Sequence, residues 1–185
     1  MSSIEILAIV ASLAGVILSM GRKSLAWLCN ILASGLYGYI FWQSGLYSDM
    51  ELQGFFILMA AYGWWNWSQS EADWKPEKSS YLPLLKGLMI ALLFGAGSGY
   101  LHLLYFPSVS FPYLDATLTG LSIYGTWLAT KRKIENWVVW IIVDFAYVGM
   151  YLSKGLWGTA VLYGVFIVLA IKGYVDWHKQ LKDRA

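Results

Sequence analysis

Charged residues are scarce in this chain. Lysine, arginine, aspartate and glutamate make up 13% of its 185 residues and hydrophobic residues 58%, whereas an ordinary soluble domain has roughly 25% charged residues. So few charged groups cannot cover a folded surface in water. The sequence therefore predicts an integral membrane protein with the lipid bilayer as its solvent.

Other shortages exclude further classes. A net charge of +2 leaves no basic face that could neutralise a run of phosphates, so nucleic-acid binding is excluded. The single cysteine, Cys29, cannot form an internal disulfide. Two distant histidines, without a CxxC, HExxH or glycine-rich phosphate motif, indicate no metal site and no cofactor. No nucleophile with an adjacent base points to an enzyme.

What the chain does contain is long apolar stretches. A bilayer core of about 30 Å needs about 20 helical residues. The first stretch follows no basic residue and has no small-residue cleavage site, so it is predicted to be a permanent span and not a removed signal. The whole chain is predicted to be one all-α transmembrane domain with seven spans, at residues 4–20, 24–43, 50–67, 82–105, 113–130, 135–152 and 156–177.

The chain also contains an internal duplication. Residues 5–67 align without a gap with residues 115–177, at an offset of 110, with 17 identities in 63 pairs. The identities include Trp27 with Trp137, and composition bias does not readily place tryptophans in register. Residues 4–67 and 113–177 are therefore predicted to be two repeats of three spans each.

The fourth predicted span, residues 82–105, joins the repeats as an unpaired linker. Its Gly95, Gly97 and Gly99 indicate a close helix contact. Three spans and a linker make an even number of crossings, so both repeats cross the membrane in the same direction. This 3+1+3 arrangement predicts parallel repeats about a pseudo-twofold axis along the membrane normal, with a central cavity between them.

The basic residues predict the orientation. On the predicted topology, 12 of the 13 lysines and arginines fall on one side of the membrane and only Lys154 falls on the other. Cytoplasmic loops carry the excess of positive charge. We therefore expect the N-terminus outside and the C-terminus in the cytoplasm.

Polar side chains inside the spans are candidate site residues, because a charge at the bilayer centre costs about 2.5–3.5 kcal/mol on insertion scales. Asp144 lies near the middle of the sixth predicted span, and its helix face also carries aromatic residues. The equivalent face of the second span is aromatic and neutral, and Gln53 lies a turn into the third span. The candidate residues are Trp137, Trp140, Asp144 and Tyr147 on one face, Trp27, Asn30, Ser34 and Tyr37 on the other, and Gln53.

Facing each other, these residues would form a pocket with aromatic walls, an amide and a carboxylate. Such a pocket suits a flat, polar, cationic ring, because aromatic faces and a buried carboxylate both attract a cation. The alternative interpretation is that the tryptophans and tyrosines belong to interface belts or pack between helices.

Several short segments resemble a known family. They are Gly45-Leu46-Tyr47, Gln53, Tyr62-Gly63-Trp64, Asp115, and the run from Lys131 through Trp137 followed by Trp140. With these segments the chain resembles the PnuC family of bacterial vitamin transporters over nearly its whole length. The resemblance implies facilitated diffusion of an unphosphorylated B-vitamin through the bacterial inner membrane, with a cytoplasmic kinase trapping the vitamin. It also implies Trp140, Asp144 and Gln53 as site residues.

In the founding members, which carry nicotinamide riboside, the residue at the place of Asp144 is asparagine. Family members that carry thiamine are similar to this chain as well, so thiamine stays an alternative substrate. A proton-coupled carrier that uses Asp144 stays an alternative mechanism, and a membrane enzyme or sensor subunit stays an alternative class. The sequence leaves the oligomeric state open, a homo-oligomer included.

Overall fold

The computed structural model describes residues 3–43, 47–69, 75–105, 111–153 and 157–182, and the regular structure within them is helical. The seven predicted spans are confirmed, most of them to within three residues at each end. The helices are α1 Ser3–Met20, α2 Leu25–Gln43, α3 Tyr47–Ser68, α4 Tyr81–Tyr105, α5 Pro112–Thr130, α6 Glu135–Ser153 and α7 Trp157–Lys182.

The largest difference from the prediction is at the end of α7. This helix continues past Trp177 to Lys182, with Lys179 and Lys182 in its last turn. Lysines there interact favourably with the negative end of the helix dipole. The prediction placed the end of the span where the apolar stretch ends, whereas the helix continues through the polar residues that follow.

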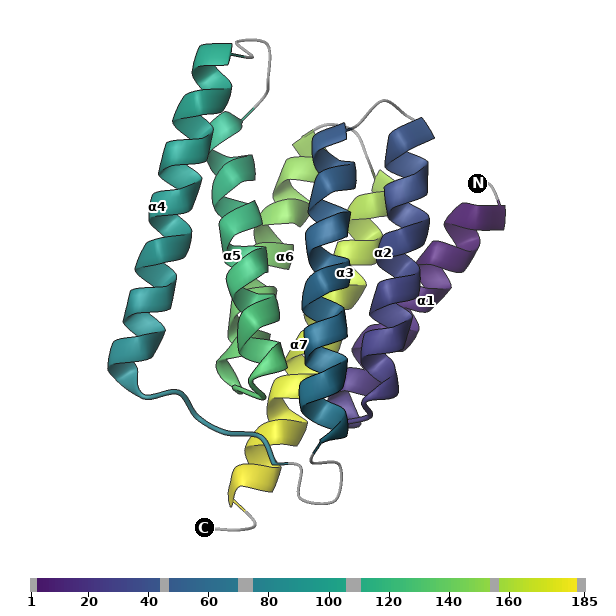
Figure 1. The fold of residues 1–185 in the computed structure, drawn as a ribbon, viewed down its shortest axis with the longest axis vertical. Coiled ribbons are helices and arrows are strands. Elements are labelled where there is room, and N and C mark those ends of the chain that lie inside the picture. Colours follow the sequence, from purple (N-terminus) through teal and green to yellow (C-terminus); the bar gives the residue numbers. More distant parts are fainter. Residues whose placement is uncertain (1–2, 44–46, 70–74, 106–110, 154–156, 183–185) are drawn as a thin grey trace.

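Six of the helices form a closed ring. Neighbours in sequence pack within the triplets α1–α2–α3 and α5–α6–α7, and the contacts of α3 with α5 and of α1 with α7 close the ring. Both α1 and α5 begin at the end of the bundle nearest the N label, and α7 ends at the opposite end (Figure 1). The linker helix α4 lies outside the ring and packs on α5.

The contact between α4 and α5 depends on glycines, as predicted for two of the three positions. A methyl group built on Gly95 would lie 2.6 Å from Thr117, and one on Gly99 would lie 2.7 Å from Tyr113. Gly97 faces no atom within 4 Å. Small residues therefore let the two backbones approach closely, which is how helices associate in lipid.

The two triplets share local geometry at the offset of 110. Arg22 and Arg132 both adopt a left-handed conformation, with φ of 60° at each, directly after α1 and α5. In both turns the next residue's N–H reaches a leucine carbonyl five residues back, Lys23 to Leu18 and Lys133 to Leu128. The turns thus have the same C-terminal capping pattern. The pseudo-twofold rotation between the whole triplets stays a prediction.

The outer surface is apolar. Among its most exposed side chains are Leu58, Ile90, Phe145 and Val161, which are 67–73% exposed. Among the described residues, two segments qualify as membrane spans by length and hydropathy alone, Tyr81–Tyr105 and Ala160–Lys182, and the segments Ile6–Met20 and Leu25–Ile40 are shorter apolar helices. The ring helices carry polar groups on the faces that line the cavity, which lowers the mean hydropathy of most of them.

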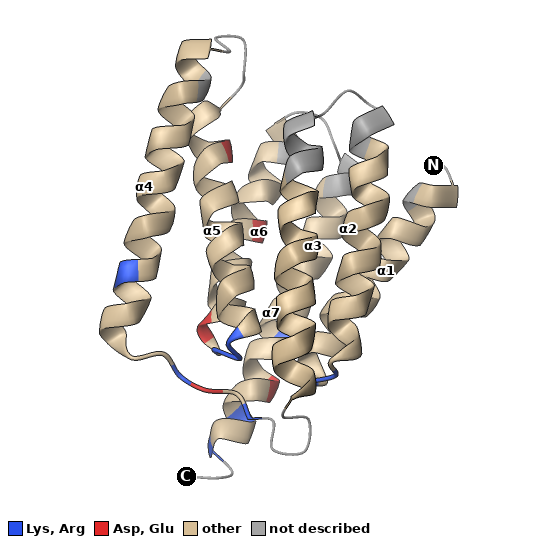
Figure 2. Ribbon diagram, in the orientation of Figure 1, with Lys and Arg blue, Asp and Glu red and all other residues tan. Residues whose placement is uncertain are grey.

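The described basic residues gather at one end of the bundle, the end that holds the C-terminus (Figure 2). There the segment before α4 crosses to the turn between α5 and α6. Glu77 N–H donates to Arg132 O and Ile134 N–H donates to Glu77 O, each at 2.9 Å. Lys133 pairs with the Glu77 carboxylate at 2.6 Å. We call residues 75–80 the strap.

Candidate functional site

A cavity of about 360 Å³ lies inside the six-helix ring. Its volume falls within the range of about 300–1,000 Å³ found for small-molecule sites. None of the residues that line it comes from α4. The lining comprises Ser12, Val16, Ser19, Trp27, Asn30, Ala33, Ser34, Tyr37, Leu52, Gln53, Phe56, Ala60 and Trp67 from the first triplet, and Ser122, Thr126, Ala129, Asn136, Trp137, Trp140, Asp144, Tyr147, Leu162, Tyr163, Phe166, Ala170 and Trp177 from the second.

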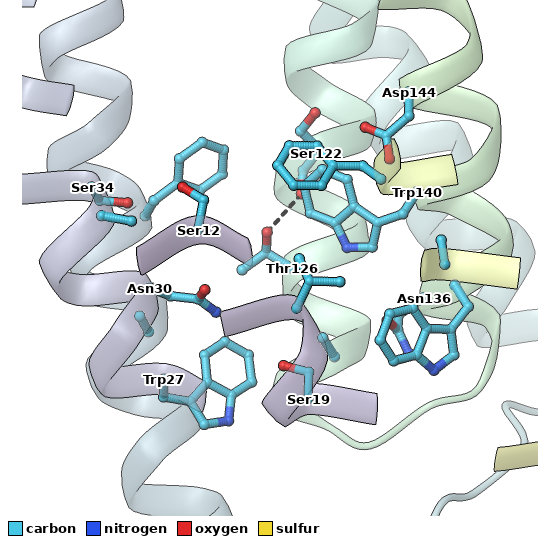
Figure 3. A pocket seen from close by; sticks show the side chains of 18 of the residues that line it. Ser12, Ser19, Trp27, Asn30, Ser34, Ser122, Thr126, Asn136, Trp140 and Asp144 are labelled. Atoms are coloured by element: carbon cyan, nitrogen blue, oxygen red, sulfur yellow. Dashed lines mark hydrogen bonds between the residues drawn. The ribbon is translucent and has the colours of Figure 1, made fainter. Parts of the chain in front are cut away.

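All of the predicted site residues line this one cavity. Figure 3 shows Asn30 and Ser34 of α2 on one side of it and Trp140 and Asp144 of α6 on the other, with Thr126 between them. The structure therefore brings together residues that lie more than 100 positions apart in the sequence. Their part in binding a ligand stays a prediction.

Asp144 gives the cavity its charge. It is 4% exposed, and it has no hydrogen bond or ion pair with any residue that the structure describes. The described lining contains no lysine, arginine or histidine. An ionised carboxylate without a partner in an apolar interior is costly. A ligand that brings a positive charge to this cavity would offset that cost.

Two glycines seat the polar and aromatic side chains at the centre. A methyl group on Gly15 of α1 would clash with the Asn30 amide oxygen. A methyl group on Gly125 of α5 would lie 3.1 Å from Val139 and 3.5 Å, an ordinary contact distance, from the Trp140 indole nitrogen. Gly15 and Gly125 are equivalent in the duplication, and so are Asn30 and Trp140. The two halves thus hold different side chains in equivalent seats.

Four serine and threonine residues in the cavity walls were not predicted as site residues, and three of them form hydrogen bonds within their own helices. Each of these three donates to a carbonyl four residues earlier in its own helix, Ser12 to Ala8 at 2.9 Å, Ser122 to Leu118 at 2.8 Å and Thr126 to Ser122 at 2.9 Å. Because their protons are used in this way, the hydroxyl oxygens offer acceptors to a ligand. The signal that could have found two of them is that Ser12 and Ser122 are identical in the duplication.

Tyr163 of α7 and Asn136 of α6 also line the cavity without having been predicted. The ring of Tyr163 lies 5.2 Å from that of Tyr147 and 5.6 Å from that of Phe166. Asn136 donates to Lys133 O at 2.6 Å. Tyr163 is the duplication partner of Gln53, so the repeat alignment could have identified it.

Four tryptophans close the cavity at the end where α3 finishes. The edge-to-face pairs Trp27–Trp67 and Trp137–Trp177 each have ring centroids 5.3 Å apart, and Trp67 lies 6.1 Å from Trp177. All four are at most 4% exposed. The alternative interpretation of Trp27 and Trp137 as packing residues is therefore correct as well, because they border the cavity and also pack into this cluster. We call these four residues the tryptophan floor.

A ring of apolar helices around a central cavity with aromatic walls and a few polar groups is typical of a membrane transporter of small molecules. Comparison with known proteins makes the assignment specific. The chain belongs to the nicotinamide mononucleotide transporter family, whose family model matches residues 2–179. Its family and its structural relatives are transporters that work in the membrane, as the resemblance implied.

Three relatives illustrate the range of the family. The nicotinamide riboside transporter PnuC of Escherichia coli is 26% identical over 206 residues, which cover 95% of this chain and 86% of the relative. PnuC of Neisseria mucosa is 23% identical, with 95% of this chain and 73% of the relative covered. The riboflavin/roseoflavin transporter RibM of Streptomyces davaonensis is 26% identical, with 80% and 68% covered.

A solved structure supports the fold independently. The crystal structure of the Vitamin B3 transporter PnuC matches with a TM-score of 0.75 at 20% identity, over 97% of this chain and 82% of that chain. The likeness shows that this chain has the same fold.

Proposed function

We propose that the protein imports nicotinamide riboside through the bacterial inner membrane by facilitated diffusion, and that it has no enzymatic activity of its own. The observation that carries this proposal is the unpaired carboxylate of Asp144 beside Trp140 in a cavity whose described lining has no basic residue. Nicotinamide riboside has a flat pyridinium ring with a positive charge and a neutral sugar. It matches both the charge and the aromatic walls.

The same charge pattern argues against the mononucleotide for which the family is named. A phosphate group needs lysine, arginine or an array of backbone N–H groups. The described lining supplies no basic side chain, and Asp144 would repel a phosphate. The transported species is therefore the unphosphorylated riboside, and a cytoplasmic kinase that phosphorylates it would prevent its return.

Each side of the cavity has its own role. Trp140 stacks on the pyridinium ring, a cation–π contact of about 0.5–2 kcal/mol, and Asp144 balances the charge. Asn30 and Gln53 form hydrogen bonds with the polar groups of the substrate. Trp27, Tyr37, Trp137 and Tyr147 complete the aromatic walls.

Alternating access follows from the architecture of the ring. The two triplets meet at the contacts of α3 with α5 and of α1 with α7. Rocking of one triplet against the other around the central cavity would open it to one side and then to the other. The basic end of the bundle, with the strap and the tryptophan floor, faces the cytoplasm by the positive-inside rule.

Calorimetric binding to the purified protein tests the substrate. We expect nicotinamide riboside to bind and the mononucleotide not to bind. Asp144→Asn should weaken binding of the riboside by at least about tenfold, or 1.4 kcal/mol. Asp176→Asn is the matched control, because Asp176 pairs with Lys172 on α7 outside the cavity lining.

Unchanged affinity in Asp144→Asn, or binding of the mononucleotide as tight as that of the riboside, would overturn the proposal. Thiamine is titrated in parallel, since it too is a cationic aromatic ring. Thiamine that binds more tightly than the riboside would replace it as the proposed substrate.

Liposomes that contain only this protein test the mode of transport. A uniporter equilibrates the riboside across the membrane and stops there, with or without an imposed proton gradient. Accumulation above equilibrium that depends on the gradient would instead establish proton coupling, with Asp144 as the carboxylate to substitute first.

A further inference from the structure

The cavity is built almost entirely from residues that occur in pairs at the offset of 110. Of its 26 lining residues, 24 form 12 such pairs, and seven of those pairs are identical. Over the whole duplication only 17 of 63 pairs are identical. The duplication is therefore best preserved where the two halves face the cavity, and the pairs that differ there are informative.

The differences follow one pattern. At the three pairs with the largest change of side chain, Asn30/Trp140, Ser34/Asp144 and Gln53/Tyr163, the first triplet has a small neutral hydrogen-bonding group. The second triplet has an aromatic ring or the carboxylate. One wall thus suits hydroxyl and amide groups, and the opposite wall suits a cationic ring (Figure 3).

The small neighbours of one of these pairs, in contrast, are the same. Gly15 contacts Asn30 so closely that a methyl group there would clash with the amide oxygen, and Gly125 lies at ordinary contact distance from Trp140. Position 30, which carries an amide, and position 140, which carries an indole, therefore both have a glycine as neighbour. The difference between the walls lies in the side chains and not in the positions that carry them.

A cavity with two identical walls would bind an asymmetric ligand equally well in two orientations. Unequal walls favour one of them, by the difference in free energy between the two ways of placing ring and sugar. A preference of tenfold needs only about 1.4 kcal/mol. Exchange of one amide for one indole and of one hydroxyl for one carboxylate is sufficient for such a difference.

We propose that these three pairs determine which way round the substrate lies, with its ring against the second triplet and its hydroxyl-bearing part against the first, and that the two sets of side chains are interchangeable between the halves. The inference rests on the proposed function for the chemistry of the ligand. It assigns a specificity role to Tyr163 in addition to the residues predicted from the sequence. Under the predicted rotation about the membrane normal, an exchanged set stays at the same depth and the ligand turns round.

Exchange variants test the inference by riboside binding. Substituting the second triplet alone, with Trp140→Asn, Asp144→Ser and Tyr163→Gln, should weaken binding more than 100-fold. Adding the reciprocal changes Asn30→Trp, Ser34→Asp and Gln53→Tyr places the same side chains on the opposite wall. Affinity should then return to within about tenfold of the original, or about 1.4 kcal/mol.

A smaller version of the exchange has a matched control. In an Asp144→Ser background, Ser34→Asp should recover a substantial part of the lost affinity, because position 34 is the partner of position 144. Ser12→Asp in the same background should recover none, although Ser12 also lines the cavity. Equal recovery by both variants would overturn the inference. Recovery by neither variant would also overturn it, provided that a thermal unfolding transition shows that both proteins are folded.

Ligand analogues give a readout that does not require the multiple variants to fold. Loss of affinity on removing a sugar hydroxyl should be smaller in Gln53→Ala than in the original protein, and unchanged in Trp140→Phe. If Gln53→Ala instead altered the loss of affinity caused by changes to the aromatic ring of the ligand, the proposed orientation would be overturned. Absence of riboside binding to the unaltered protein is a separate outcome that contradicts the proposed function and not the orientation.

Discussion

At the scale of the residue, the seat of Asn30 shows how a second layer controls the cavity. The amide contacts Gly15 so closely that no larger residue fits there without moving it. Gly35, on α2, has nothing within 4 Å of a methyl group built on it. Of these two glycines in the same triplet, Gly15 therefore positions a cavity side chain and Gly35 does not.

This difference gives a prediction. Gly15→Ala should lower affinity for the riboside several-fold, because the added methyl group displaces the Asn30 amide from the cavity wall. Gly35→Ala should leave affinity unchanged and serves as the control. Binding to both purified variants measures the effect, and equal affinities would show that the position of Asn30 is irrelevant.

The sequence predicted the carboxylate, two of the amides and several aromatic members of the cavity, but of its serine and threonine hydroxyls it predicted Ser34 alone. Asp144 and Asn30 were detectable because a charge or an amide inside a span is costly and is therefore rare without a function. Ser12, Ser122 and Thr126 were not, since serine and threonine satisfy their donors within their own helix and are common in spans without a function. The repeat alignment distinguishes Ser12 and Ser122, which are identical partners, but not Thr126, whose partner is Val16.

At the scale of the element, the contact of α3 with α5 is reinforced at the end of the bundle where the basic residues gather. The rings of Tyr62 and Trp127 stack with centroids 5.8 Å apart and an interplanar angle of 8°. The Lys131 ammonium lies 5.0 Å and 4.9 Å from the two centroids. Asn66 donates to Thr130 O, and Arg132 donates to Asn66 O at 2.7 Å. The strap lies over the same turn.

The equivalent contact of α1 with α7 has different side chains. Lys172 stands at the place of Tyr62, Ile17 at that of Trp127 and Gly21 at that of Lys131. These three residues cannot form two stacked rings with a cation above them. The two contacts that close the helix ring are therefore made by different side chains, although the duplication relates them.

We expect the contact of α3 with α5 to stay closed during transport while the contact of α1 with α7 opens. In a Cys29→Ser background, Tyr62→Cys with Trp127→Cys should tolerate a short bifunctional thiol reagent with transport retained. The equivalent pair, Lys172→Cys with Ile17→Cys, should lose transport when cross-linked. Liposome uptake before and after treatment measures both, and inhibition of the first pair alone would contradict the expectation.

The helices were predictable because each is a long apolar stretch, and polar turns separate one stretch from the next. The strap was not, since residues 75–80 have no periodic pattern and their order comes from pairing with residues 132–134, far away in the sequence. The role of Asn66 was predictable only as a residue at a helix end. Its hydrogen bond to Thr130 depends on the approach of the second triplet.

At the scale of the whole molecule, the distribution of charge predicts orientation. Lys179, in the last turn of α7, and Phe111, which is 48% exposed before α5, lie at opposite ends of the bundle. In a Cys29→Ser background, a membrane-impermeant maleimide on intact cells should label Phe111→Cys and not Lys179→Cys. Labelling of both after permeabilisation is the control, and the reverse pattern would invert the assignment.

Both triplets cross the bilayer in the same sense, since α1 and α5 begin at the same end of the molecule (Figure 1). Transporters with inverted repeats can generate their opposite-facing state when the two halves trade conformations. Because the two triplets of this chain are parallel, an exchange of conformations between them gives a state that opens to the same side of the membrane. The gates on the two sides of the membrane must therefore be formed by different residues. Mutations can then change the rate of release on one side without changing uptake on the other.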